Sequence, residues 1–162
     1  MQTMIAKPQQ VARQELELVT FRVGKLTFGI EIHHVKEINS HLVPTRAPHA
    51  HRAVLGVMNL RGDVITVVDL ATLLKLPQRS EGARGKGVIV SVEGELVAVA
   101  VDQVEDVVTL ERHELHPLPP NFRLGDSRVY QGVYPTEHGL VVLLDIVEAM
   151  EMHLQRESSS RS

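Results

Sequence analysis

Apolar and polar residues alternate with a period of two along most of the chain, the pattern of β-strands that bury one face. Short glycine-containing segments interrupt the alternation, such as Gly24-Lys25 and Glu93-Gly94, and glycine supplies the positive φ that a tight turn needs. The sequence therefore predicts four β-hairpins and a further strand at 104–108. The paired strands are 19–23 with 26–32, 54–60 with 64–68, 88–92 with 96–101, and 129–134 with 140–144.

Two short helices are predicted where this alternation ends. One would begin at Asp69 and place Leu70, Leu73 and Leu74 on a single face. The other would begin at Asp145, with Glu148 three residues later as in a capping box. It would bury Ile146, Ala149 and Met150.

The order of elements repeats along the chain, which indicates an internal duplication. A shift of 76 positions brings Gly56 onto Gly132 and Asp69 onto Asp145, and a shift of 69 brings Ile30 onto Val99 and Ile32 onto Val101. Each half then reads as hairpin, strand, hairpin and short helix. Five short strands suit a small barrel, so we expect each half to curl into one.

The repeat also predicts the domain organisation. We expect one domain at 16–152, with a first lobe at about 16–76 and a second at about 87–152. The segment 77–86 holds glycines among charges and is predicted to be a linker. Residues 1–15 and 153–162 are predicted to be a flexible lead and a flexible tail.

Composition narrows the function classes. Hydrophobic residues make up 43% of the chain and aromatic residues only 3%, so Val, Leu and Ile must fill a real core. A net charge of −3 is no electrostatic footprint for nucleic acid, which would need a strongly basic face. With no cysteine there is neither disulfide nor thiolate-bound metal, and no apolar run approaches the ~20 residues of a membrane span. A soluble cytoplasmic protein is expected.

The chain has nine histidines, which could bind a metal, but their spacing argues against a metal site. His33 and His34 are adjacent, so on a strand their side chains would point to opposite faces. No helical His-x-x-x-His pair is present, and no cysteine can complete a set of ligands. We therefore expect surface histidines and no metal. The other clustered histidines are His41, His49, His51, His113 and His116.

Catalytic patterns are equally weak. Gly82, Gly85 and Gly87 lie among basic residues as in a phosphate loop, but a strand follows them where a helix N-terminus would be needed. Ser91 lies inside a strand and Ser40 has no evident base, so no nucleophile and base can be paired. The chain is predicted to be a binding module without cofactors, not an enzyme.

The turn residue Arg61 is the main candidate for partner contact. Its counterpart at a shift of 76 is Glu137, so the scaffold does not require arginine at this turn. A guanidinium offers five donors in a fixed fork that suits a carboxylate on another protein. Two interpretations stay open on the residues alone, a solvated turn residue or a partner-binding arginine.

The segment Leu55-Gly56-Val57-Met58-Asn59-Leu60-Arg61-Gly62 is similar to the G-x-x-N-L-R-G turn of the CheW family. The stretches at 28–38, 64–70, 99–104 and 140–146 also resemble that family, so the likeness covers about 17–150. It implies a mainly β fold of two intertwined five-stranded SH3-like barrels with short helices and a shared apolar core. It also implies a non-enzymatic adaptor.

The resemblance further implies the partners. These are the regulatory domain of a chemotaxis histidine kinase and the cytoplasmic tip of methyl-accepting chemoreceptors, with the protein in the cytoplasm at receptor arrays on the inner membrane. The partner-binding residues implied are Val35, Glu37, Ile38, Gly56, Asn59, Arg61 and Gly62. The alternative left open is a small-molecule sensor or enzyme on a duplicated barrel, with its site in the groove between the lobes.

Overall fold

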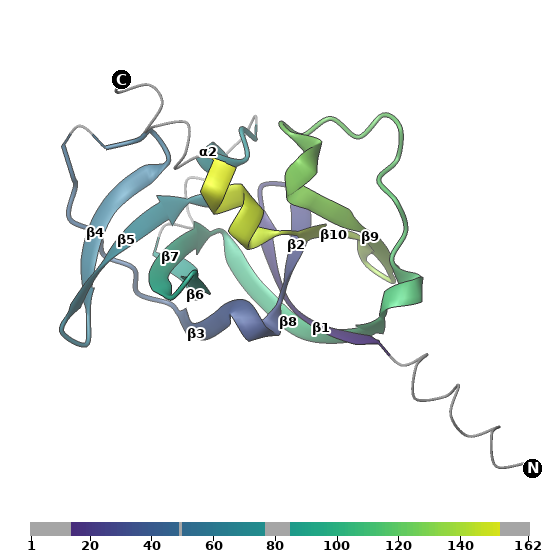
Figure 1. Ribbon diagram of the computed structural model, residues 1–162, viewed down its shortest axis with the longest axis horizontal. Coiled ribbons are helices and arrows are strands. Elements are labelled where there is room, and N and C mark those ends of the chain that lie inside the picture. Colours follow the sequence, from purple (N-terminus) through teal and green to yellow (C-terminus); the bar gives the residue numbers. More distant parts are fainter. Residues whose placement is uncertain (1–13, 49, 77–84, 153–162) are drawn as a thin grey trace, which may run out of the picture.

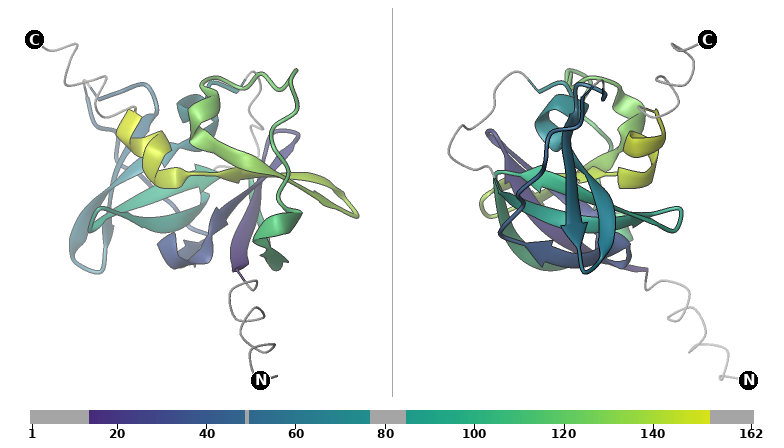
Figure 2. Two further views of the ribbon diagram at one scale, coloured as in Figure 1. Left: turned by 45° about the vertical axis from the view of Figure 1, so that its right-hand side comes forward. Right: turned by 90° about the vertical axis from the view of Figure 1, so that its left-hand side faces the viewer.

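Two five-stranded sheets lie side by side in the computed structural model of the chain (Figures 1 and 2). The structure describes residues 14–48, 50–76 and 85–152, so the predicted tail, His49 and most of the predicted lead and linker lie outside the described residues. The strand order is β8-β1-β2-β10-β9 in one sheet, here sheet A, and β3-β6-β7-β5-β4 in the other, sheet B. The strands are β1 (Glu15–Val23), β2 (Leu26–Glu31), β3 (Val35–Asn39), β4 (Val54–Leu60), β5 (Asp63–Asp69), β6 (Lys86–Val92), β7 (Glu95–Val101), β8 (Gln103–Glu111), β9 (Tyr130–Thr136) and β10 (Gly139–Leu144).

The four predicted hairpins are confirmed as antiparallel pairs, β1 with β2, β4 with β5, β6 with β7 and β9 with β10. The predicted end of the strand at 26–32 is wrong. Strand β2 ends at Glu31, and Ile32–His34 forms a 3₁₀ turn that leaves the Ile32 side chain 37% exposed. The chain must leave sheet A at this point to enter sheet B at β3, so the alternation could not continue through Ile32.

Neither half of the sequence forms a sheet alone, so the expectation that each half curls into its own barrel is wrong. Sheet B is built from the continuous segment 35–101, whereas sheet A combines 15–31 with 103–144. Two parallel pairs, β2 with β10 and β5 with β7, join strands from different halves. The sheets are therefore intertwined, as the family resemblance implies.

The duplication is visible in the structure. Strands β4 and β9 have the same length and are offset by 76 positions. The two helix starts match as well, because the Asp69 N–H donates to the Ala53 carbonyl and the Asp145 N–H donates to the Val129 carbonyl, both at 2.7 Å. Asp69 caps the start of helix α2 (Leu70–Leu73), and a helix at 146–152 follows Asp145, so both helices start where they were predicted to.

The main hydrophobic core lies between the sheets and is filled by both. It contains Phe21 and Phe28 of sheet A together with Val88, Val90 and Val99 of sheet B. Both short helices add to this core, and the helix at 146–152, yellow in Figures 1 and 2, lies over the junction of the sheets. Each sheet also has a smaller cluster of its own. The shared core is thus confirmed.

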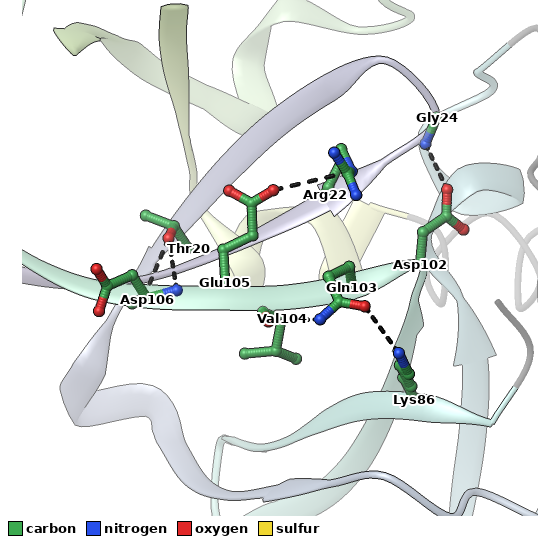
Figure 3. Close-up of polar contacts among 9 residues, drawn as sticks. All are labelled: Thr20, Arg22, Gly24, Lys86, Asp102, Gln103, Val104, Glu105 and Asp106. Carbon is green, nitrogen blue, oxygen red and sulfur yellow. Dashed lines mark hydrogen bonds and ion pairs between the residues drawn. The ribbon is translucent and has the colours of Figure 1, made fainter. Parts of the chain in front are cut away.

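The chain returns from sheet B to sheet A at Asp102, between β7 and β8, and polar contacts hold this crossover (Figure 3). The Asp102 carboxylate accepts a hydrogen bond from the Gly24 N–H at 2.7 Å, at the turn of the first hairpin. Further along, the buried Thr20 hydroxyl lies at an irregularity in the β1–β8 register. It donates to the Asp106 carbonyl at 3.0 Å and accepts from the Asp106 N–H at 3.1 Å.

Candidate functional site

Strands β3 and β4 are the two edges of sheet B, and an ion pair joins them. The Arg61 guanidinium, at the turn after β4, lies 2.8 Å (Nη2 to Oε2) from the Glu37 carboxylate of β3. The loop after β3 adds a backbone bridge to β4, in which Thr45 and Val57 exchange hydrogen bonds of 2.7 and 2.8 Å. Sheet B therefore curls until its edges meet, and two of the predicted site residues meet at that seam.

The turn itself presents the arginine outward. Arg61 and Gly62 have φ values of 53° and 91°, and the Asn59 side-chain oxygen accepts a hydrogen bond from the Gly62 N–H at 2.9 Å. An arginine in the left-handed region carries backbone strain that a glycine would avoid. Its side chain is 78% exposed despite the contact with Glu37. The ion pair orients the guanidinium and leaves most of it accessible.

The equivalent turn of sheet A is built differently. Glu137 occupies the position that corresponds to Arg61, and the Thr136 hydroxyl accepts from the His138 N–H at 3.2 Å. Both turns close a hairpin of matching strands, so the fold accepts either sign of charge at this place. The arginine is thus not required by the turn.

The other predicted site residues divide into exposed and buried ones. Ile38 follows Glu37 on β3 and is 53% exposed. It lies two residues after Lys36, which is also exposed. Val35 is half-buried and packs against the main core. Gly56 is buried, and a Cβ there would overlap the Thr45 carbonyl oxygen and lie 2.6 Å from the carbonyl carbon. A packing requirement of this kind explains the glycine without any partner.

One exposed apolar residue beside this turn escaped the sequence analysis. Val64 is 71% exposed, because Ile65 and Val67 define the buried face of β5 and Val64 lies on the opposite one. Ile65 and Val67 alternate with Val64 and Thr66 along the strand, and this alternation could have predicted that Val64 lies on the exposed face. An open groove of about 490 Å³ begins here and is lined by 63–66 of β5 and 94–97 at the start of β7. Val64 thus adds an exposed apolar side chain three positions after Arg61 in the chain.

The adjacent histidines lie closer together than predicted. The reasoning that His33 and His34 point to opposite faces is wrong, because they belong to a 3₁₀ turn and their ring centroids are 4.0 Å apart. Partial burial, and then the neighbouring His33, lower the pKa of His34. Their ligand atoms and a Glu31 carboxylate oxygen all lie within 4.8 Å of one another.

Among the described residues, no helix is both long enough and apolar enough to cross a bilayer.

Comparisons with known proteins agree with this architecture. Residues 17–153 match the CheW-like domain family. The chain is 32% identical over 130 residues to the chemotaxis protein CheW of Rhizobium meliloti, covering 80% of this chain and 84% of that protein. It is 29% identical over 143 residues to the chemotaxis protein CheW of Bacillus subtilis, covering 88% and 89%.

A solved structure shows the same fold. The scaffolding protein TtCheW from Thermoanaerobacter tengcongensis superposes with a TM-score of 0.72 at 23% identity, covering 81% of this chain and 89% of that one. The family match decides between the two functions that the sequence left open and excludes the enzyme. This chain belongs to the CheW family of non-enzymatic scaffolding proteins of chemotaxis signalling.

Proposed function

We propose that this chain binds the regulatory domain of a chemotaxis histidine kinase and the cytoplasmic tip of chemoreceptors at once, in the cytoplasm at receptor arrays. As a scaffold it forms and breaks no covalent bond. It transmits a signal only if the receptor's two conformations contact it differently, because a binding partner shifts an equilibrium by its differential affinity.

The kinase contact is assigned to the arginine-turn surface, defined as Glu37, Ile38, Asn59, Arg61 and Gly62. The observation that carries this assignment is an arginine oriented by Glu37 yet 78% exposed. An oriented guanidinium loses less side-chain freedom on binding than a free one, and it offers several donors to a carboxylate. The exposed Ile38 supplies an apolar neighbour, as interface cores need.

For the receptor contact we infer a groove at the junction of the two sheets, where a helical hairpin from the receptor tip would lay its apolar face. The proposal requires this receptor surface to be separate from the arginine-turn surface. Two separate surfaces let one chain hold both partners simultaneously, which is what coupling requires.

The test is a calorimetric titration of each partner into three proteins. These are the unaltered chain, Arg61→Glu and the matched control Glu137→Arg, which changes charge at the equivalent turn of sheet A. We expect Arg61→Glu to bind the kinase domain about thirtyfold more weakly or worse, since loss of a central interface arginine costs about 2 kcal/mol or more. The control should bind normally.

Folding is checked by circular dichroism on all three proteins. The assignment fails if Arg61→Glu folds and binds the kinase domain as tightly as the unaltered chain does. It also fails if Glu137→Arg weakens binding by the same factor, because the effect would then not be specific to the turn that carries Arg61.

A further inference from the structure

The 3₁₀ turn Ile32–His34 joins the last strand residue of β2 to the first of β3 and is drawn dark blue in Figure 1. It is therefore one of the two places where the described part of the chain crosses between the sheets. The Val35 N–H donates to the Ile32 carbonyl and closes the turn. This geometry turns two consecutive imidazoles toward each other, with ring centroids 4.0 Å apart and planes at 43°.

These imidazoles share their surroundings with a carboxylate. Glu31 precedes the turn, and one ligand atom from each of Glu31, His33 and His34 lies within 4.8 Å of the other two. Around a tetrahedral zinc ion with bonds of ~2.0–2.1 Å, ligand atoms are roughly 3.3–3.4 Å apart. Side-chain rotation can shorten these separations, and the exposed His33 has room for it. Two histidines and one carboxylate are a donor set that zinc uses, with a fourth position left for water.

The repeat shows that the fold does not require histidine here. At a shift of 69, His33 and His34 correspond to Asp102 and Gln103 at the other crossover. There the Asp102 carboxylate is occupied as a hydrogen-bond acceptor for Gly24. The pair of imidazoles is therefore an addition to the scaffold at this one crossover.

The chain also contains a similar cluster that serves as a comparison. Glu111, His113 and Glu114 lie equally close, but His113 Nδ1 is 3.0 Å from the Glu111 carboxylate and Glu114 accepts from the Glu111 N–H at 3.2 Å. Its groups are thus committed to one another, and it offers only one imidazole. Around the first cluster, the nearest ion-pair partner described is Arg112, whose Nη2 is 4.0 Å from Glu31 Oε1 and whose side chain is 54% exposed. A contact that long and that solvated leaves the second carboxylate oxygen available.

We propose that Glu31, His33 and His34 form a binding site for one divalent zinc ion at the crossover from sheet A to sheet B. The bound ion would connect the end of β2 to the start of β3, and β3 carries Glu37 and Ile38 of the arginine-turn surface. Zinc binding would therefore stiffen the strand that presents this surface.

The experiment uses the untagged full chain, stripped with chelator and titrated calorimetrically with zinc chloride alone. His33→Ala and His34→Ala remove one ligand each, Glu31→Gln removes the charge while keeping the side-chain shape, and His113→Ala is the matched control. We expect one saturable site per chain and at least about tenfold weaker binding in each ligand variant, since even outer-shell changes at zinc sites cost 10–100-fold. His113→Ala should bind zinc as the unaltered chain does.

Two further measurements keep the result independent of folding defects. Zinc should raise the melting temperature of the unaltered chain and of His113→Ala, and should not raise that of His33→Ala. In the unaltered chain, the imidazole NMR signals of His33 and His34 should shift together on zinc addition. The proposal is overturned by the absence of saturable binding, by ligand variants that bind normally, or by an equal loss in His113→Ala. No partner protein is needed, so failure here leaves the coupling function untouched.

Discussion

Replacing Gly56 with alanine tests how sheet B is closed. The new Cβ would overlap the Thr45 carbonyl oxygen, so the Thr45 backbone has to move. That movement disrupts the two hydrogen bonds between Thr45 and Val57, worth about 1 kcal/mol each. The φ of +150° adds strain of about 1–3 kcal/mol for any side chain. We expect Gly56→Ala to lower the free energy of unfolding by about 3–5 kcal/mol.

The matched control is Gly62→Ala. Gly62 has a φ of +91°, and a Cβ added there would have no neighbouring atom within 4 Å, so alanine costs only the strain. Urea denaturation followed by circular dichroism should therefore place Gly56→Ala about 2 kcal/mol below Gly62→Ala, the value of the two lost hydrogen bonds. Gly132→Ala should behave like Gly56→Ala, because its Cβ would lie 2.6 Å from the His116 carbonyl oxygen. Equal stabilities of Gly56→Ala and Gly62→Ala would refute the reasoning.

Three further predictions concern other contacts. A double-mutant cycle on Arg61 and Glu37 should give a coupling energy of only about 0.2–1 kcal/mol, because the Arg61 side chain is 78% exposed and water screens the pair; a value above about 2 kcal/mol would contradict this. Burial raises the pKa of Tyr130 to about 12 from its usual 10.0, so the unfolded tyrosine ionises first and the protein should lose stability as the pH rises from 10 to 12. Tyr130→Phe should abolish that part of the alkaline loss in urea titrations at several pH values, and an identical pH profile would be evidence against it. Asp102→Ala should cost about 1.5–3 kcal/mol by denaturation, as expected for a hydrogen bond from Gly24 to a charged group, and a loss below about 0.5 kcal/mol would rule out that role.

The hairpins and helix starts were predictable because their determinants are local. A turn residue such as Gly24 and a period of two define a pair of neighbouring strands, and Asp69 and Asp145 mark helix starts through their own side chains. The duplication was predictable too, since both halves repeat these local signals in the same order.

The pairing between halves was not predictable, because a period of two specifies which face is buried and not which strand lies alongside. Strands β2 and β10 are more than one hundred residues apart, and no pattern in their sequences predicts that they pair in parallel. The contact of Glu37 with Arg61 exists only because the edges of sheet B meet, which the sequence does not show. The histidine cluster was missed because His33 and His34 were treated as strand residues, whereas they belong to the 3₁₀ turn Ile32–His34.

Along the sequence, the segment that forms sheet B lies between the two segments that form sheet A, and this order has a consequence for synthesis on the ribosome. All strands of sheet B have emerged once Val101 leaves the exit tunnel, so this sheet can assemble while the chain is still growing. The first hairpin, made earlier, has to wait for β8 and β10 before its two edges are covered. We expect this waiting hairpin to be the segment of the nascent chain that most needs protection by a chaperone, since uncovered strand edges are where chains aggregate.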